Sequence, residues 1–315
     1  MEVEKTLSII TINYNGLKDT CELMETLPLE DKSIEVIVVD NASKDDEASI
    51  IEQRYPQATV IRSKENLGFA GGNNLGIQAS HGKYLFFINN DTLLTTASIL
   101  PPKQGDREGL TSYFQPLIDR LESSPKIGLV CPKIRFAWGN NPIQYAGYTP
   151  LSKITFRNSA IGYGEEDQGQ YDIPHPTPYA HGAAMMVKYE VIDKVGVMPE
   201  CYFLYYEELD WSMMIRRAGY DIWYEPAFTI YHKESQATGQ SSPLKSYYMT
   251  RNRLLFAKRN INSPQKYLTY SYLIGIVAIR DILKSLLSQR LDLVKATLKG
   301  LRDFITFNFQ LSTFN

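Results

Sequence analysis

Four candidate strands of this chain are followed by polar side chains that could bind a ligand together. Because ligands of open α/β sheets bind outside the carboxyl ends of the strands, these side chains predict a binding cleft along one rim. Asn and Asp are also ordinary turn residues, so one such strand end by itself would indicate only a turn. The polar ends are Asn13-Tyr14-Asn15-Gly16, Asp40-Asn41-Ala42-Ser43, Asn89-Asn90-Asp91 and His232.

Asp91 and His232 are the candidate metal ligands of this rim. A carboxylate oxygen suits a hard divalent cation, and an imidazole nitrogen is tolerated better by Mn²⁺ than by Mg²⁺. A metal ion held there beside a phosphate site would neutralise a diphosphate. The alternative for His232 is a histidine at a strand end that hydrogen-bonds to backbone.

Three carboxylates, Glu207, Glu208 and Asp210, stand at the start of a predicted helix among aromatic residues. Acids in a first helical turn are favoured by the helix dipole, so helix stability alone could account for them. Partial burial among the aromatic rings would instead raise the pKa of a carboxylate towards that of a general base. The chemistry indicated is deprotonation of an acceptor hydroxyl beside a metal-bound diphosphate leaving group.

A glycine-rich stretch, ENLGFAGGNNLG, runs from Glu65 to Gly76. We expect Gly71 and Gly72 to open a helix whose N-terminus favours anions, although a tight turn would use the same residues. The first strand is not followed by GxGxxG, which disfavours NAD and FAD, and no GxxxxGK[ST] motif is present.

The elements that must position these residues alternate between strand and helix patterns. Helices of this length between strands imply βαβ crossovers, a mostly parallel sheet and an α/β fold of the Rossmann-like kind. The expected strands are Thr6–Ile12, Ile34–Val39, Thr59–Arg62, one from Tyr84, Gly128–Ile134 and Ile222–Ile230. The expected helices are Leu17–Leu27, Asp45–Tyr55, Gly71–Ser80, Tyr113–Leu121, Tyr189–Val195, Glu208–Ala218 and those from Leu244 to the end. Thr95–Gly109 is expected to be a surface loop, and Ala137–Tyr179 to be irregular with short strands.

Composition bounds the class of protein. The 315 residues are 43% hydrophobic and 22% charged, which suits one large domain or one domain with an appendage. A net charge of −2 gives no sign of general nucleic-acid binding. The three cysteines form no CxxC pair and fit a reducing compartment. Neither a secretory leader nor a membrane-spanning helix is expected.

These motifs together resemble the family 2 glycosyltransferases of the GT-A fold, and within them the rhamnosyltransferase-like group. The resemblance runs from about Leu7 to Asn260. It rests on SIITINYNG, VIVVDNAS, ENLGFAGGNNLGI, FINNDT, the segment from His181 to Trp211, and MIRRAG, which occur in family order.

The resemblance implies an inverting transfer from a nucleotide-activated sugar, with Mg²⁺ or Mn²⁺ on the diphosphate. The implied donor is dTDP-rhamnose, with a UDP-hexose or UDP-GlcNAc as the alternative, and the implied acceptor is a polysaccharide or lipid-linked glycan. Glu208 matches the general base, Asp91 the acid of the DxD position, and His232 the late metal ligand. The positions that match donor-binding residues are Thr11, Asn13, Asp40, Asn66, Gly71, Asn73, Asn90 and Asp91.

Three positions depart from the family pattern. Asn89 replaces the first acid of DxD, so only Asp91 can anchor a metal there. Glu208 stands where this group usually has Asp, and Glu207 or Asp210 could serve as the base instead. His181 stands where a small hydroxyl residue often precedes Gly-Ala, and it could alter ligand contacts or fill space.

We expect residues 1–243 to form the catalytic domain, with a nucleotide-sugar half at about 1–95 and an acceptor half at about 110–243. Residues 244–315 would form a helical extension. Its basic and aromatic residues fit either a helix in a membrane interface or a helical pair packed on the catalytic domain or on a second subunit. The resemblance, which implies a lipid-linked acceptor, favours peripheral contact with the inner face of the cytoplasmic membrane.

Two other functions fit the sequence less well. A nucleotidyltransferase would show a Gly-rich run with Arg and Lys soon after the first strand, which NYNG does not. A non-catalytic sugar-nucleotide or glycan-binding module would not need Asp91, Glu208 and His232 together.

Overall fold

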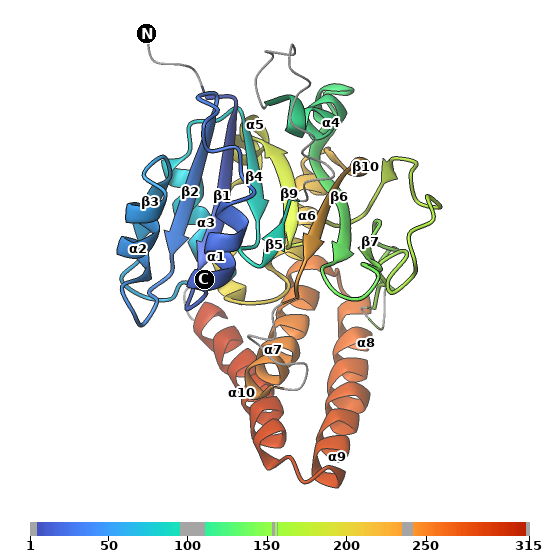
Figure 1. The fold of residues 1–315 in the computed structure, drawn as a ribbon. Coiled ribbons are helices and arrows are strands. Elements are labelled where there is room, and N and C mark those ends of the chain that lie inside the picture. The colour runs from blue at the N-terminus through green and yellow to red at the C-terminus, as the bar shows by residue number, and fades with distance from the viewer. Residues whose placement is uncertain (1–4, 95–110, 153–154, 156, 235–241, 313–315) are drawn as a thin grey trace.

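The computed structural model describes residues 5–94, 111–152, 155, 157–234 and 242–312. In these ranges a ten-stranded sheet is covered by helices, and a helical extension lies at one end of it (Figure 1). The expected loop at Thr95–Gly109 lies outside the described residues.

The strands are β1 (Leu7–Asn13), β2 (Ile34–Asp40), β3 (Thr59–Arg62), β4 (Tyr84–Ile88), β5 (Thr92–Leu93), β6 (Ile127–Phe136), β7 (Ile143–Tyr145), β8 (His175–Pro176), β9 (Ala184–Lys188) and β10 (Asp221–His232). The helices are α1 (Leu17–Met24), α2 (Glu47–Arg54), α3 (Gly68–Ala79), α4 (Thr111–Glu122), α5 (Tyr189–Val195), α6 (Glu207–Arg217), α7 (Pro243–Asn260), α8 (Gln265–Tyr272), α9 (Ile279–Leu287) and α10 (Leu291–Ser312). Short turns of 3₁₀ and π helix, η1 (Glu200–Tyr202) and η3 (Leu273–Ala278), complete them.

The sheet is parallel in its N-terminal half and mixed beyond it. The strand order is β3-β2-β1-β4-β9-β6-β10-β5, and β3, β2, β1 and β4 are parallel neighbours. Asn13 of β1 pairs with Asp40 of β2, which places these two predicted rim residues side by side. The predicted α/β architecture with a C-terminal helical extension is therefore confirmed, with an antiparallel centre that the pattern did not indicate.

That antiparallel centre is strand β9, which pairs with both β4 and β6. Its five residues run straight into helix α5 at Tyr189, with no turn residue between them. A short apolar run that abuts a helix cannot be assigned to either state by periodicity, which explains why no strand was predicted there.

The glycine that opens helix α3 is Gly68, which corrects the expectation for Gly71 and Gly72. Gly68 has φ +71°, and a Cβ atom there would lie 2.1 Å from the carbonyl oxygen of Phe203. Gly71 and Gly72 lie inside the helix, where a Cβ on Gly72 would come within 2.8 Å of Ile12. Gly72 lets the helix pack closely on β1, whereas a Cβ on Gly71 would meet the side chain of Leu67, and neither glycine forms the N-terminus of the helix.

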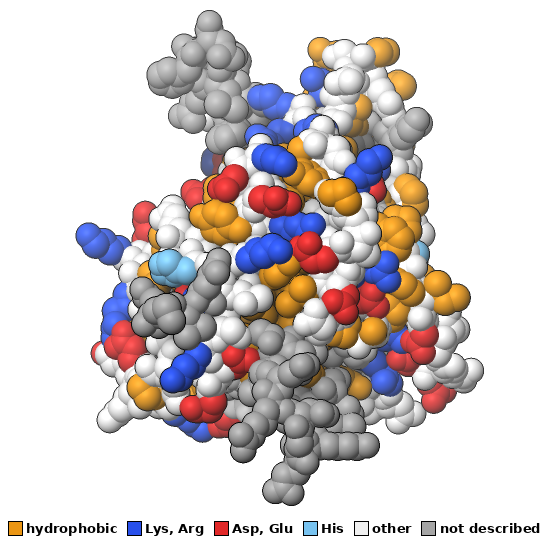
Figure 2. Space-filling model, turned by 90° about the horizontal axis from the view of Figure 1, so that it is seen from above, with side chains coloured by type: hydrophobic (Ala, Val, Ile, Leu, Met, Phe, Trp, Pro, Cys, Tyr) orange, Lys and Arg blue, Asp and Glu red, His pale blue; other side chains and the backbone are white. Residues whose placement is uncertain are grey.

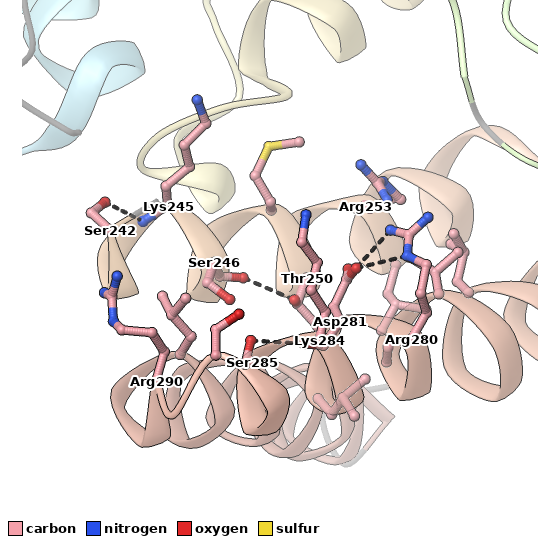
Figure 3. A pocket seen from close by; sticks show the side chains of 18 residues that line it. Ser242, Lys245, Ser246, Thr250, Arg253, Arg280, Asp281, Lys284, Ser285 and Arg290 are labelled. Atoms are coloured by element: carbon pink, nitrogen blue, oxygen red, sulfur yellow. Dashed lines mark hydrogen bonds and ion pairs between the residues drawn. The ribbon is translucent and has the colours of Figure 1, made fainter. Parts of the chain in front are cut away.

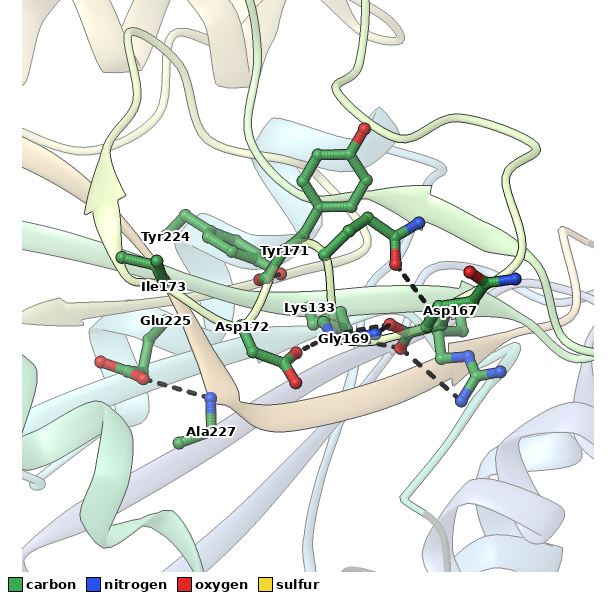
Figure 4. Close-up of polar contacts among 12 residues, drawn as sticks. Lys133, Asp167, Gly169, Tyr171, Asp172, Ile173, Tyr224, Glu225 and Ala227 are labelled. Atoms are coloured by element: carbon green, nitrogen blue, oxygen red, sulfur yellow. Dashed lines mark hydrogen bonds and ion pairs between the residues drawn. The ribbon is translucent and has the colours of Figure 1, made fainter.

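The region Ala137–Tyr179 is irregular with short strands, as predicted, and polar contacts bind it to the sheet (Figure 4). The buried Lys133 of β6 pairs with Asp167 at 3.1 Å and also with Asp172. The hydroxyl of Tyr224 on β10 donates to the carbonyl of Tyr171 at 3.0 Å.

Helices α7 to α10 lie at the end of the sheet towards which the parallel strands run (Figure 1). They form a second hydrophobic cluster with the segment that precedes α6, in which Tyr202 and Tyr206 pack with Leu254, Leu255 and Phe256 of α7. The helical pattern expected from Leu244 is confirmed as far as Ser312. The predicted domain boundary near residue 243 stays a prediction.

Surface charge is mixed on the face shown in Figure 2, where Lys and Arg lie among Asp and Glu side chains. Within the described ranges, no helix is both long enough and apolar enough to cross a membrane.

Candidate active site

The ends of β1 and β2 form a buried hydrogen-bond network. The Asn13 side-chain amide donates to Asp40 Oδ1 at 2.8 Å and to Glu47 Oε2 at 2.7 Å, and Asn13 Oδ1 accepts from Thr20 at 2.7 Å. Thr20 Oγ1 in turn accepts from Asn90 Nδ2 at 3.0 Å. The network fixes the ends of β1, β2 and β4 relative to one another, because each amide has few rotamers that satisfy these partners.

A cleft of about 420 Å³ opens above this network. Asn41, which is buried, holds one wall by donating to the carbonyl of Gly68 at 3.0 Å and accepting from the backbone N–H of Leu67 at 2.9 Å. The cleft is lined by Ile12, Tyr14, Asn15, Asn41, Asn66, Gly68, Phe69, Asn73, Ile88, Asn89, Asn90, Asp91, Phe203, Leu204 and Leu244.

Asp91 and His232, which are 141 positions apart in the chain, meet at this rim. His232 Nε2 lies 3.1 Å from Asp91 Oδ1, and both residues are buried. His232 Nδ1 lies 2.8 Å from Gln144 Oε1. Because an amide oxygen only accepts, this contact places the proton on Nδ1 and turns the Nε2 lone pair towards the carboxylate.

This donor set fits a divalent cation. An imidazole lone pair and a carboxylate oxygen facing each other need a positive charge between them, either a proton or a metal ion. In the part of the chain that the structure describes, no cluster of three or more His, Cys, Asp or Glu side chains could hold a metal ion. A cation at Asp91 and His232 would therefore take its remaining ligands from solvent or substrate.

Glu208 lies beside the cleft in the first turn of α6. A Cβ atom on Gly182 would be 3.8 Å from both Glu208 Cγ and the ring of Phe69, which lines the cleft. Ser212 donates to the carbonyl of Glu208 at 2.6 Å and accepts from the backbone N–H of Ala180 at 3.0 Å. Burial raises the pKa of the Glu208 carboxyl above its ordinary value.

The other two acids of the cluster have different surroundings. Glu207 is buried with one carboxylate oxygen that has no hydrogen-bond partner, and burial, followed by the charge of Glu208, raises its pKa strongly. Asp210 is fully buried and paired: it accepts from Arg259 Nε and, at 2.7 Å, from Asn260 Nδ2. Asp210 thus joins α6 to α7, whereas Glu208 lies near Phe69, a residue of the cleft wall.

The segment before α6 carries unusual backbone conformations that helix α7 holds in place. Phe203, Tyr205 and Tyr206 have φ of 68°, 68° and 79°. The Asn252 side chain donates to the carbonyls of Tyr202, Leu204 and Tyr205 at 2.9, 2.7 and 3.0 Å. A left-handed backbone at non-glycine residues persists only where several surrounding contacts hold it in place, as the hydrogen bonds of Asn252 do here.

His181 connects the two halves of the site. Its ring stacks on Tyr148 at 5.9 Å and meets the ring of His232 edge-on at 6.5 Å. Its Nδ1 accepts from the backbone N–H of Ala183 at 3.1 Å, and burial lowers its pKa to about 3, so the ring is neutral. His181 fills space between the acidic helix and the rim.

The structure brings most of the predicted site residues to one place. Asn66, Asn73, Asn90 and Asp91 line the cleft. Thr11, Asn13 and Asp40 lie buried beneath it, and Gly71 lies inside α3. Their roles stay predictions.

The side chains of Gln144, Asn252 and Asn41 hold much of the site in position through their hydrogen bonds. The motifs assigned no individual role to any of the three. Asn41 could have been found, because it directly follows Asp40 at a strand end. Gln144 and Asn252 act only through long-range contacts, for which the sequence gives no local signal.

The chain is similar in sequence to known glycosyltransferases. Residues 8–101 match a family model described as glycosyl transferase family 2. The low-salt glycan biosynthesis hexosyltransferase Agl10 of Haloferax volcanii is 25% identical over 93% of this chain and 89% of its own length. The N-acetylglucosaminyl-diphospho-decaprenol L-rhamnosyltransferase of Mycobacterium tuberculosis is 22% identical over 74% of this chain and 78% of its own length.

Solved structures share the fold. A mannosyltransferase from Pyrobaculum calidifontis, PcManGT, in complex with GDP-Man and Mn²⁺ has a TM-score of 0.56 and 15% identity, over 96% of this chain and 88% of that one. GalNAc-T7 with UDP, GalNAc and Mn²⁺ has a TM-score of 0.58 and 14% identity, over 95% of this chain. This chain spans about half of GalNAc-T7, 55% of its length. The predicted GT-A fold is confirmed.

Proposed function

Since the chain is a family 2 glycosyltransferase of the GT-A fold, we propose that it transfers rhamnose from dTDP-rhamnose, with inversion, to a polysaccharide or lipid-linked glycan. The single observation that carries this proposal is the convergence of the Asp91–His232 pair and Glu208 on one cleft at the strand ends. A UDP-hexose is the alternative donor, because one similar protein is a hexosyltransferase.

Glu208 acts as the general base in this proposal. Its raised pKa lets it take the proton of an acceptor hydroxyl, whose oxygen then attacks the anomeric carbon as the bond to the diphosphate breaks. Attack from the face opposite the leaving group inverts the anomeric configuration. Asp210 cannot serve because Arg259 and Asn260 already occupy its oxygens.

Asp91 and His232 would hold Mg²⁺ or Mn²⁺, with Gln144 keeping the His232 lone pair available. When bound, the metal ion would neutralise the diphosphate leaving group. Asn66, Asn73 and Asn90, which line the cleft, would hydrogen-bond the donor. The helical extension would contact the inner face of the cytoplasmic membrane or a second subunit.

Calorimetric titration with dTDP-rhamnose, UDP-glucose, UDP-GlcNAc and GDP-mannose, with Mn²⁺, Mg²⁺ or EDTA, tests the proposal. We expect one donor to bind only with metal, and the Asp91→Asn variant to bind it at least about tenfold more weakly. Asp193→Asn, an exposed acid on α5, is the matched control and should behave like the parent.

The anomeric configuration of the product, read by NMR, decides between inversion and retention. Failure of every donor to bind with any metal would overturn the chemistry while leaving the fold. Binding of a donor without turnover on any glycan acceptor would favour the non-catalytic module instead.

A further inference from the structure

A second cavity, of about 460 Å³, lies within the helical extension (Figure 3). Its walls come from α7, from η3 and α9, and from the turn that leads into α10. None of its lining residues is shared with the cleft described above. It is therefore a separate site that the sugar-transfer chemistry does not explain.

The cavity is strongly cationic. A single carboxylate, Asp281, lines it, against five cations: Lys245, Arg253, Arg280, Lys284 and Arg290. Arg280 pairs with Asp281 at 2.6 Å, Arg290 pairs with Asp292 at 2.7 Å, and Arg253 Nε donates to the Tyr206 hydroxyl at 2.8 Å. Lys245 and Lys284 make no ion pair with any residue that the structure describes. The excess positive charge calls for an anion, and clustered Lys and Arg donors match the oxygens of a phosphate.

Two hydroxyl groups that line the cavity, those of Thr250 and Ser285, cannot donate a hydrogen bond to a ligand. Thr250 donates to the carbonyl of Ser246 at 2.8 Å, and Ser285 donates to the carbonyl of Asp281 at 2.7 Å. Each hydroxyl carries one proton, so these two have none left for a ligand. Thr250 and Ser285 therefore leave the anion to the cations and to the other hydroxyl groups that line the cavity.

The cationic side of α9 adjoins an exposed apolar side. Arg280 and Lys284 are four residues apart and share one face, while Ile279, Leu283 and Leu287 are spaced by four along the neighbouring face. Leu287 is 87% exposed, and Ile279 and Leu283 are about half exposed. Exposed apolar side chains also occur on α8, η3 and α10, among them Tyr267, Ile276 and Leu298.

The exposed apolar side chains indicate whether the anion is a free ion or part of a lipid. Helices of globular proteins turn their apolar stripe inward, and a concentration of exposed apolar side chains marks a protein or membrane contact. Cations set directly beside exposed Leu and Ile are typical of a helix lying in a membrane interface. A free phosphate ion would satisfy the cations but would leave the apolar side chains in water.

The cavity also adjoins the cleft through the first turn of α7. Leu244 lines the cleft and the next residue, Lys245, lines the cavity. A lipid phosphate held at Lys245 would therefore keep the cleft close to the membrane surface.

We propose that this cationic cavity binds the phosphate group of a membrane lipid, while the exposed apolar side chains of α8 to α10 enter the acyl layer. The proposal rests on the membrane contact proposed above for the helical extension and deepens it by naming the lipid group that is bound. It does not depend on the sugar transfer, so the two can fail separately.

Vesicle sedimentation with the full chain tests this proposal. Three compositions are compared: phosphatidylcholine alone, phosphatidylcholine with phosphatidate, and phosphatidylcholine with enough oleate to match the negative charge. We expect the tightest binding to the phosphatidate vesicles. The double variant Lys245→Gln, Lys284→Gln should lose about 20-fold or more in affinity for them, at about fivefold for each charge near the surface.

The matched control is Lys295→Gln, Lys299→Gln, which removes two exposed charges of α10 outside the cavity. The control should keep the preference for phosphatidate over oleate, and the cavity variant should lose it. Donor binding by both variants, measured in parallel, checks that each is folded.

Three outcomes would overturn the proposal. Equal binding of the parent to phosphatidate and oleate vesicles would mean attraction by charge alone. Loss of the preference in the control variant would remove the cavity from the explanation. Inorganic diphosphate binding as tightly as phosphatidate vesicles would identify a free anion as the ligand.

Discussion

The irregular region beside β6 and the first turn of α6 both bury charged side chains, but they surround them differently. Lys133 is 4% exposed on its side chain and lies between Asp167 and Asp172 (Figure 4). Glu207 is equally buried and has an oxygen without a partner, and Glu208 next to it makes no ion pair with a described residue. Asp210, one turn further on, is paired like Lys133.

The difference separates scaffold from site. A buried charge with partners can fix one segment to another, whereas a buried carboxylate without them is destabilising and holds its proton more tightly. Such a group persists where a raised pKa has a use, which makes perturbed carboxylates at a cleft candidates for catalysis. Four substitutions test this distinction.

The largest expected effect is on turnover in Glu208→Gln. Removing a general base lowers the rate by about 10²- to 10⁴-fold, while donor binding should stay close to that of the parent. Single-turnover rates and calorimetry on the same preparation measure the two quantities. A variant that keeps more than about a tenth of the parent rate would move the base to another residue.

Lys133→Met should have the largest effect on stability. It leaves Asp167 buried with its nearest cation, Arg135, at 3.8 Å, and breaking a buried pair on one side costs about 3–5 kcal/mol of unfolding free energy. Urea unfolding at neutral pH measures this loss. The exposed Lys126→Met serves as the control, and an equal loss there would show that Lys133 is not specially placed.

Asp210→Asn should destabilise the protein by about 1–3 kcal/mol, because an amide replaces a charged acceptor of two hydrogen bonds. Its turnover should fall far less than that of Glu208→Gln. Thermal unfolding and initial rates at saturating donor measure both effects. A rate loss as large as that of Glu208→Gln would remove the contrast between the paired and the unpaired acid.

Glu207→Gln should have the smallest effect, and its sign depends on pH. The pKa of Glu207 is raised in the folded chain, so its contribution to stability is full at low pH and falls as pH rises through the folded value. The neutral Gln should thus stabilise the protein at neutral pH, on the order of 1 kcal/mol, with no difference below about pH 4. Melting temperatures from pH 4 to 8 measure the trend, and destabilisation at high pH would contradict it.

Local pattern was sufficient for a large part of the fold. The run Tyr84–Ile88 followed by Asn89-Asn90-Asp91 indicated both a buried strand and a polar rim, because both features depend on the types of residues that are adjacent in the chain. The helix that begins at Glu207 and the strand that ends at His232 were found for the same reason. Strand β9 and the opening of α3 at Gly68 were not, since each depends on a neighbour distant in the chain.

The amino-acid sequence specifies the chemical groups and the side of the sheet on which they lie. Which of these groups are available depends on the packing of distant segments. This packing paired Asp210 with Arg259, left Glu208 beside the cleft, and turned His232 towards Asp91 through Gln144. It also gathered five cations from α7, from α9 and from the turn that leads into α10 into one cavity. The physical reason is that availability depends on what lies opposite a side chain in space, and chain order does not record that.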